Sequence, residues 1–129
     1  QTCALPILKP RKWGRNVNCS SGAGLVGGFV GATAYAITKA GIMTMTKSFA
    51  KDLGPHGITV NTLSPGAIDT PMQRTGMTKE TLENARSRIP LGRMGLASEC
   101  ARGAVFLASD LASYVNGHIL AVDGGFLMR

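Results

Sequence analysis

The sequence contains a pair of residues whose types and spacing suit proton transfer, Tyr35 and Lys39. Residues four apart on a helix share a face, so the lysine ammonium can lie beside the tyrosine phenol. A nearby cation stabilises a phenolate, which lets a tyrosine exchange protons nearer to neutral pH. The spacing alone is weak evidence, because such pairs are common and usually lie on a solvated helix face. The neighbouring motifs therefore decide the interpretation.

A literal GxGxxG motif occupies residues 22–27, after an expected strand. In a dinucleotide-binding fold this motif opens directly into the helix that holds the pyrophosphate. Here more glycines follow, so we expect no helix before about Thr33, and no acidic residue stands roughly 20 positions downstream. We therefore interpret residues 22–31 as a flexible wall over a ligand and not as a pyrophosphate loop.

The elements that must position these residues follow from periodicity and from chain breakers. We expect strands at 14–20, 57–63 and 117–122, a turn at 64–66, and helices at 34–53, 77–88 and 98–107. On the first helix Ile42, Met45, Phe49 and Leu53 make one apolar stripe. On the third helix Ala101, Val105 and Ala108 lie on one side. Alternating strands and helices predict βα crossovers and hence a parallel α/β sheet.

Composition bounds the class of protein. The 129 residues make about one domain, and a content of 44% hydrophobic and 16% charged residues is typical of a globular protein. The net charge is +7, and four of the basic residues cluster near the start. We interpret Lys9, Arg11, Lys12 and Arg15 as a solvated basic surface and expect no nucleic-acid partner.

Membrane and metal functions are not expected. The uncharged stretch at 16–38 is interrupted by polar residues and glycines, and we find no signal peptide. Cys3, Cys19 and Cys100 are too widely spaced for a disulfide framework, which favours a reducing compartment and a cytoplasmic location. His56 and His118 have no suitably spaced partner ligands, so we expect no metal site.

Four motifs together resemble those of one enzyme superfamily. They are NCSSGAG at 18–24, YAITKAG at 35–41, VNTLSPGAIDTPM at 60–72 and YVNGHILAVDGG at 114–125. In content and order they are similar to the C-terminal half of the short-chain dehydrogenase/reductase superfamily, from about residue 8 onward. The resemblance implies half of a Rossmann-like, doubly wound parallel sheet, with about three strands and flanking helices. The family's pyrophosphate turn, its Asn-Asn-Ala-Gly segment and its active-site asparagine belong to the other half.

The resemblance also implies roles for individual residues. Tyr35 would be the general acid/base, and Lys39 would assist it and hydrogen-bond the nicotinamide ribose. Ser21 would orient the substrate carbonyl, with Ser20 as the alternative, because Ser21 precedes Tyr35 by one residue more than is usual in the family. The residues expected to meet the nicotinamide end of the cofactor are Pro65, Gly66, the Ile68 backbone and the Thr70 hydroxyl.

The implied activity is NAD- or NADP-dependent interconversion of a small-molecule secondary alcohol and a ketone. The tail at 115–126 is similar to sugar-acid and polyol dehydrogenases, and residues 65–72 equally suit 3-oxoacyl-carrier-protein reductases. Residues 77–88 would cover the substrate. Family members usually pair through the tyrosine-bearing helix and the C-terminal strand, which implies a homotetramer or dimer. The alternative is that the chain is a truncated, non-catalytic fragment.

Residues 1–7 are expected to be foreign to the domain at 8–129. The heptapeptide QTCALPI can be encoded by CAG-ACG-TGT-GCT-CTT-CCG-ATC, which reads as the end of a common sequencing adapter. The alternative is that Ala4-Leu5-Pro6 is native, because it also suits the family.

Overall fold

The computed structural model describes residues 5–28, 30–76 and 78–128. Within them the elements follow one another in this order: α1 (Leu5–Arg11), β1 (Gly14–Cys19), α2 (Ala23–Val26), α3 (Thr33–Leu53), η1 (Gly54–His56), β2 (Ile58–Pro65), β3 (Ile68–Asp69), α4 (Pro71–Gly76), α5 (Lys79–Ser87), β4 (Gly95–Leu96), α6 (Ala97–Ala108), η2 (Asp110–Ala112) and β5 (Ile119–Val122).

Strands β1, β2 and β5 form a parallel sheet with β2 at its centre. Gly14 of β1 is in register with Ile58, and Ile119 of β5 is in register with Thr62. The first seven residues of β2 are buried, as expected for a strand that pairs on both edges and is covered on both faces. The expected Rossmann-like parallel α/β fold is confirmed.

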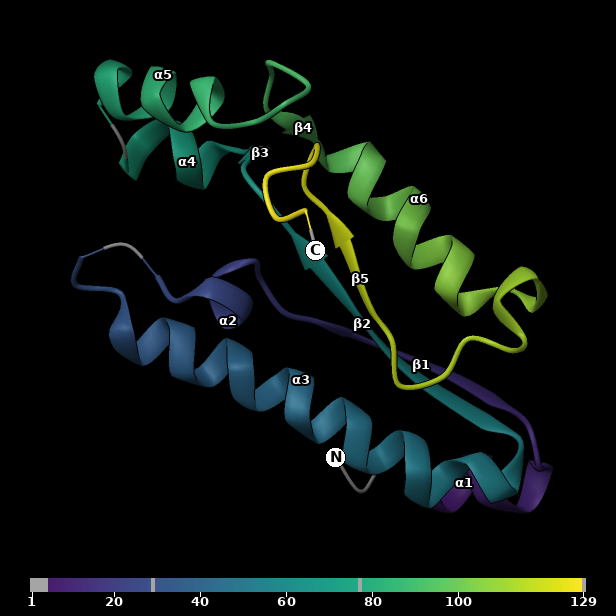
Figure 1. The fold of residues 1–129 in the computed structure, drawn as a ribbon. Helices are drawn as coiled ribbons and strands as arrows, with labels where there is room; N and C mark the ends of the chain where they lie inside the picture. The colour runs from purple at the N-terminus through teal and green to yellow at the C-terminus, as the bar shows by residue number, and fades with distance from the viewer. Residues whose placement is uncertain (1–4, 29, 77, 129) are drawn as a thin grey trace.

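Helices cover both faces of this sheet (Figure 1): α3 lies on one face and α6 on the other. Side chains alternate accordingly along β2, where Thr62 meets Thr46 of α3 and Leu63 lies beside Gly103 of α6. The short β3–β4 pair and the helices α4 and α5 lie beyond the carboxyl end of β2 (Figure 1).

The buried face of α3 differs from the predicted one. The helix itself is confirmed, but its buried residues are Met43, Thr46, Ala50 and Leu53. Of the predicted stripe only Leu53 is buried, while Ile42, Met45 and Phe49 are half-buried. The central strand presents a hydroxyl at Thr62, so the polar Thr46 occupies the centre of the contact and the larger apolar side chains flank it.

The apolar side of α6 noted in the sequence is not its buried side: Ala101, Val105 and Ala108 are all exposed. Leu107 is fully buried, and Gly103 lies one turn before it on the same face. A Cβ at Gly103 would lie 3.0 Å from the Leu63 side chain, so the missing side chain is what lets α6 approach the sheet.

Several boundaries also differ. A turn was expected at 64–66, but residues 64 and 65 belong to β2. Their pairing with β5 extends the strand through Pro65. The helix expected at 77–88 begins after Thr78, whose side chain accepts a hydrogen bond from the Thr81 N–H; Met77 lies outside the described residues. The expectation of no helix before Thr33 is also wrong, since α2 forms a four-residue helix within the glycine-rich segment.

Candidate active site

The carboxyl ends of the three parallel strands meet at one edge of the sheet. Backbone hydrogen bonds join them there, from Ser20 N–H to the Leu63 carbonyl (2.8 Å) and from Gly22 N–H to the Pro65 carbonyl (3.1 Å). Gly66 N–H donates in turn to the carbonyl of Val122 (3.0 Å). Ligands of open α/β sheets bind outside this edge, which makes it the candidate site.

Tyr35 and Lys39 lie in the first turns of α3, beside this edge. The Lys39 Nζ is 5.6 Å from the centroid of the Tyr35 ring and donates to the Cys19 carbonyl at 3.2 Å. Tyr35 is 47% exposed, so its ring is open to a ligand on one side. The structure therefore brings together the cation and the phenol that the spacing paired.

The two neighbouring serines have different environments. Ser20 is only 4% exposed, and its hydroxyl donates to the Lys39 carbonyl at 2.8 Å. Ser21 is half-buried, and its Oγ accepts a hydrogen bond from the Ala23 N–H at 3.3 Å. Because an acceptor keeps its own proton, the Ser21 hydroxyl retains a donor for a substrate oxygen.

Pro65 and Gly66 lie where β2 ends beside β5. A Cβ on Gly66 would lie 2.6 Å from the Cβ of Asp123 and 2.8 Å from its Cα, so a larger residue would push the strands apart. The Asp123 carboxylate accepts the backbone N–H groups of Gly125 and Leu127, both at 2.9 Å, and so holds the turn after β5.

Ile68 and Thr70 lie in the next segment of the chain. The Ile68 side chain is buried within β3, in register with Gly95. The Thr70 carbonyl accepts the N–H groups of Gln73 and Arg74, so Thr70 lies at the start of α4. Asp69 binds Arg74 through two hydrogen bonds of 2.7 and 2.8 Å, which lower the pKa of the Asp69 carboxyl.

Sequence reasoning assigned no role to two asparagines that lie toward the amino ends of β2 and β5, away from the candidate site. Asn61 is fully buried, donating to the Val115 carbonyl and accepting from the His118 N–H. Asn116 accepts from the Val60 N–H and donates to the Ala50 carbonyl. Together they fix the segment before β5 against β2. Both stand within motifs already quoted, Val-Asn at 60–61 and Val-Asn-Gly at 115–117, which were the available signal.

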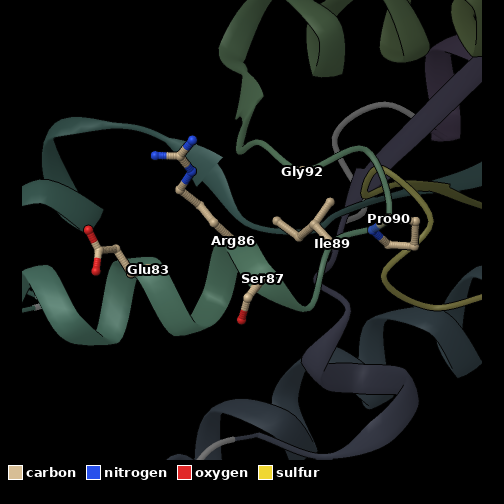
Figure 2. A pocket seen from close by; sticks show the side chains of 6 residues that line it. All are labelled: Glu83, Arg86, Ser87, Ile89, Pro90 and Gly92. Carbon is tan, nitrogen blue, oxygen red and sulfur yellow. The ribbon is translucent and has the colours of Figure 1, made fainter.

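Two open hollows lie on the α5 side of the sheet edge. The first, of about 520 Å³, is shown in Figure 2, where the Arg86 and Ser87 side chains leave α5 in different directions. It is lined by Glu83, Arg86, Ser87, Ile89, Pro90 and Gly92. The second, of about 510 Å³, lies between residues 90–95, Glu99 and residues 121–125. Neither is lined by Tyr35 or Lys39.

Arg15 and the cysteines were also considered in the sequence analysis. Arg15 is not part of a solvated basic surface, because its side chain is 9% exposed, stacks on Trp13 and pairs with Asp110. Cys19 and Cys100 are free thiols, and burial raises the pKa of Cys100. Cys3 lies outside the described residues.

Within the described ranges, no cluster of three or more His, Cys, Asp or Glu side chains could hold a metal ion. In the same ranges, none of the helices has the length and apolar character needed to cross a membrane.

The described residues thus combine a parallel α/β sheet with a tyrosine–lysine pair on the helix beside its carboxyl edge. The family model described as enoyl-(acyl carrier protein) reductase matches residues 2–127. The chain therefore belongs to the short-chain dehydrogenase/reductase superfamily.

Its relatives include 3-oxoacyl-carrier-protein reductases, as the motifs predicted, and sugar dehydrogenases. The 3-oxoacyl-[acyl-carrier-protein] reductase FabG of Thermotoga maritima is 44% identical over 124 residues, covering 96% of this chain and 50% of that protein. The L-rhamnose-1-dehydrogenase of Scheffersomyces stipitis is 41% identical over 130 residues, covering 100% of this chain and 50% of that protein. The chain thus spans about half the length of the curated relatives it matches.

Proposed function

We propose that this chain carries the catalytic residues of an NAD(P)-dependent oxidoreductase that interconverts a secondary alcohol and a ketone. The observation that carries the proposal is the position of Lys39, whose Nζ lies between the Cys19 carbonyl and the face of the Tyr35 ring. We propose that this cation supports the tyrosine during the proton transfer itself, when negative charge develops on the phenol oxygen.

The proposed roles follow from these positions. During reduction, the Tyr35 hydroxyl donates its proton to the substrate oxygen, and the Lys39 ammonium stabilises the phenolate that remains. The Ser21 hydroxyl, which keeps its own proton, donates to the same oxygen and orients the carbonyl. A bound nicotinamide cofactor would supply or accept the hydride. In oxidation the same residues act in reverse.

The residues at the sheet edge fit the nicotinamide end of NAD or NADP. Lys39 offers a cationic donor for the ribose, and Thr70 lies where α4 begins. We propose that Pro65, Gly66, the Ile68 backbone and the Thr70 hydroxyl contact the nicotinamide. The glycine-rich segment does not fit the pyrophosphate, because Gly24 packs directly on the backbone of α3.

For the substrate we propose a small molecule of one of the two kinds named by the relatives. A 3-oxoacyl thioester fits the alcohol–ketone chemistry directly. Oxidation of a sugar such as L-rhamnose at C1 would instead convert a hemiacetal to a lactone, through the same hydride and proton transfers. The resemblance leads us to propose that residues 77–88 cover the substrate. Acetoacetyl thioester reduction and L-rhamnose oxidation, assayed in parallel, distinguish the two. The resemblance also leads us to propose a homotetramer or dimer in the cytoplasm.

The test is the substitution Tyr35→Phe in the natural polypeptide that contains this chain. Removing the hydroxyl should lower turnover by about 10²–10⁴-fold, the contribution of a general acid/base, with cofactor affinity nearly unchanged. Lys39→Ala should lower both turnover and cofactor affinity, since Lys39 serves both. Tyr114→Phe is the matched control, because Tyr114 is fully exposed. Unchanged turnover in Tyr35→Phe would contradict the proposal.

The second candidate is a truncated, non-catalytic fragment. The supporting observation is that the chain spans half of its relatives. In this case Tyr35, Lys39 and Ser21 keep the same geometry but meet no cofactor.

A further inference from the structure

Ser20 lies between the end of β1 and the helix that carries the candidate catalytic pair. Its backbone N–H continues the β1–β2 ladder by donating to the Leu63 carbonyl at 2.8 Å. Its hydroxyl donates to the Lys39 carbonyl at 2.8 Å, and the residue is 4% exposed. A carbonyl oxygen has two lone pairs, so this bond adds to the hydrogen bonding of the helix without replacing it.

The side chain of Lys39 is held as well as its backbone carbonyl. Its Nζ donates to the carbonyl of Cys19, the residue directly before Ser20. Two consecutive residues of the strand end therefore fix Lys39, one through its backbone and the other through its ammonium group. The same ammonium lies over the Tyr35 ring, so its position is set before any ligand arrives.

The glycine-rich segment supports the same peptide group. A Cβ on Gly24 would lie 2.8 Å from both the Lys39 carbonyl carbon and the Ala40 nitrogen. Only glycine lets the α2 turn approach this closely, so the contact explains the middle glycine of the GxGxxG motif without a pyrophosphate. Ser20 and Gly24 thus hold the Lys39–Ala40 peptide from neighbouring segments.

We infer that Ser20 is a positioning residue, which fixes Lys39 relative to Tyr35 through the Lys39 carbonyl. Ser20 acts on the lysine and leaves the substrate oxygen to Ser21. This inference rests on the proposed function of the Tyr35–Lys39 pair.

The experiment compares Ser20→Ala and Ser20→Cys in the natural polypeptide that contains this chain. Cysteine keeps the approximate shape of serine but is a weak donor, so it separates the hydrogen bond from packing. Ser20→Thr keeps the hydroxyl and should restore the wild-type behaviour. Ser109→Ala is the matched control, because the Ser109 hydroxyl makes an equal 2.8 Å bond to a helix carbonyl, that of Phe106 in α6.

The first readout is amine labelling of Lys39, measured by mass spectrometry relative to the exposed Lys47 on the same helix. In Ser20→Ala and Ser20→Cys the ratio should rise about threefold, because a loosened strand end frees the ammonium. The second readout is whether kcat and KM change separately. Turnover should fall about fivefold to tenfold with an unchanged KM for the ketone, since Lys39 acts on the proton-transfer step.

Each outcome decides the inference. A wild-type labelling ratio in Ser20→Ala overturns it, and so does a Ser20→Cys protein with wild-type labelling and turnover. If Ser20→Ala fails to fold, the labelling ratio and the turnover of Ser20→Cys test the inference on their own. If the unsubstituted protein has no oxidoreductase activity, the proposed function fails, while the labelling ratio still determines whether Ser20 positions Lys39.

Discussion

At the scale of single residues, the hydroxyl of Thr46 connects three elements of the fold. It accepts a hydrogen bond from the Asn18 amide of β1 and donates its only proton to the Ile42 carbonyl, each at 2.9 Å. The Thr62 hydroxyl of β2, 2.7 Å away, must therefore be the donor in the third bond. Thr46 and Thr62 are fully buried, so this network fixes the distance between α3 and the sheet.

Replacing Thr46 with valine should destabilise the protein because it keeps the shape but removes the shared acceptor. The Asn18 amide and the Thr62 hydroxyl then lose their partner, at a cost of about 1–3 kcal/mol in the free energy of unfolding. Urea denaturation measures the difference. Thr44→Val, at an exposed position two residues away, should stay within about 0.5 kcal/mol of the parent. Equal losses in the two variants would contradict the network.

The sequence predicted local relationships between residues and missed distant ones. Tyr35 and Lys39 were paired correctly because helix geometry alone puts them on one face. The bond from Ser20 to the Lys39 carbonyl joins residues 19 positions apart, and Asn116 reaches Ala50 over 66 positions. Such partners depend on how the strands pack, which no local pattern contains.

At the scale of elements, Glu99 closes the beginning of α6. Its carboxylate accepts the Leu96 N–H at 2.7 Å and binds Arg93 through two hydrogen bonds of 2.7 and 2.8 Å. Leucine has no side-chain acceptor, so this is the glutamate half of a capping box. The Arg93 guanidinium, and then the Leu96 N–H, lower the pKa of Glu99 from 4.5 to about 2.

This lowered pKa predicts a pH-dependent role in stability. Glu99 holds its proton less tightly in the folded protein, so its contribution is present above pH 4.5 and is lost as the pH falls toward about 2. Glu99→Gln should therefore lower Tm at pH 7, and the difference from the parent should shrink on acidification. Circular dichroism melts at a series of pH values measure this.

The control for Glu99 is a variant that already lacks Arg93. In an Arg93→Gln background, Glu99→Gln should have a smaller effect at pH 7, because the largest cause of the pKa shift is gone. A Tm difference that stays constant between pH 7 and pH 2.5 would show that Glu99 acts without its charge.

The long elements could be predicted, but their faces and the short elements could not. The helices α3, α5 and α6 carry periodic patterns and clear stops, and all three were expected. Gly103 lies on the face of α6 that packs on the sheet. Because glycine has no side chain, it gives no apolar signal in the sequence, yet it permits the closest approach of the helix to the sheet. The two-residue strands β3 and β4 exist through their mutual pairing and have no sequence period of their own.

At the scale of the whole molecule, β1 and β5 are the edge strands of the three-stranded sheet, and each pairs with β2 on one side only. Within the described residues, β1 pairs with β2, and its other edge has no strand beside it. An open strand edge is a template for pairing with another segment. We propose that the sheet continues there in the half of the family fold that carries the pyrophosphate turn, as the match to half of each relative suggests.

We also propose that residues 1–7 are an adapter-derived segment joined to the domain at 8–129. The test is to recover the source DNA and sequence it upstream of the Leu8 codon. The proposal expects the adapter sequence to be absent from the gene and replaced by other in-frame codons. Finding codons for the same seven residues in the gene itself would show that the segment is native.

A nicotinamide fluorescence titration separates the intact enzyme from the fragment. The glycine-rich segment of this chain packs on α3 through Gly24, so the described part of that segment offers no cradle for the pyrophosphate. Because that group supplies much of the cofactor's charge for recognition, NADH and NADPH should show no saturable binding to this chain alone. The natural polypeptide that contains it should bind at least one of the two. Saturable binding by the 129-residue chain, lost in Lys39→Ala, would instead mean that the nicotinamide end is sufficient and that the fragment hypothesis is wrong.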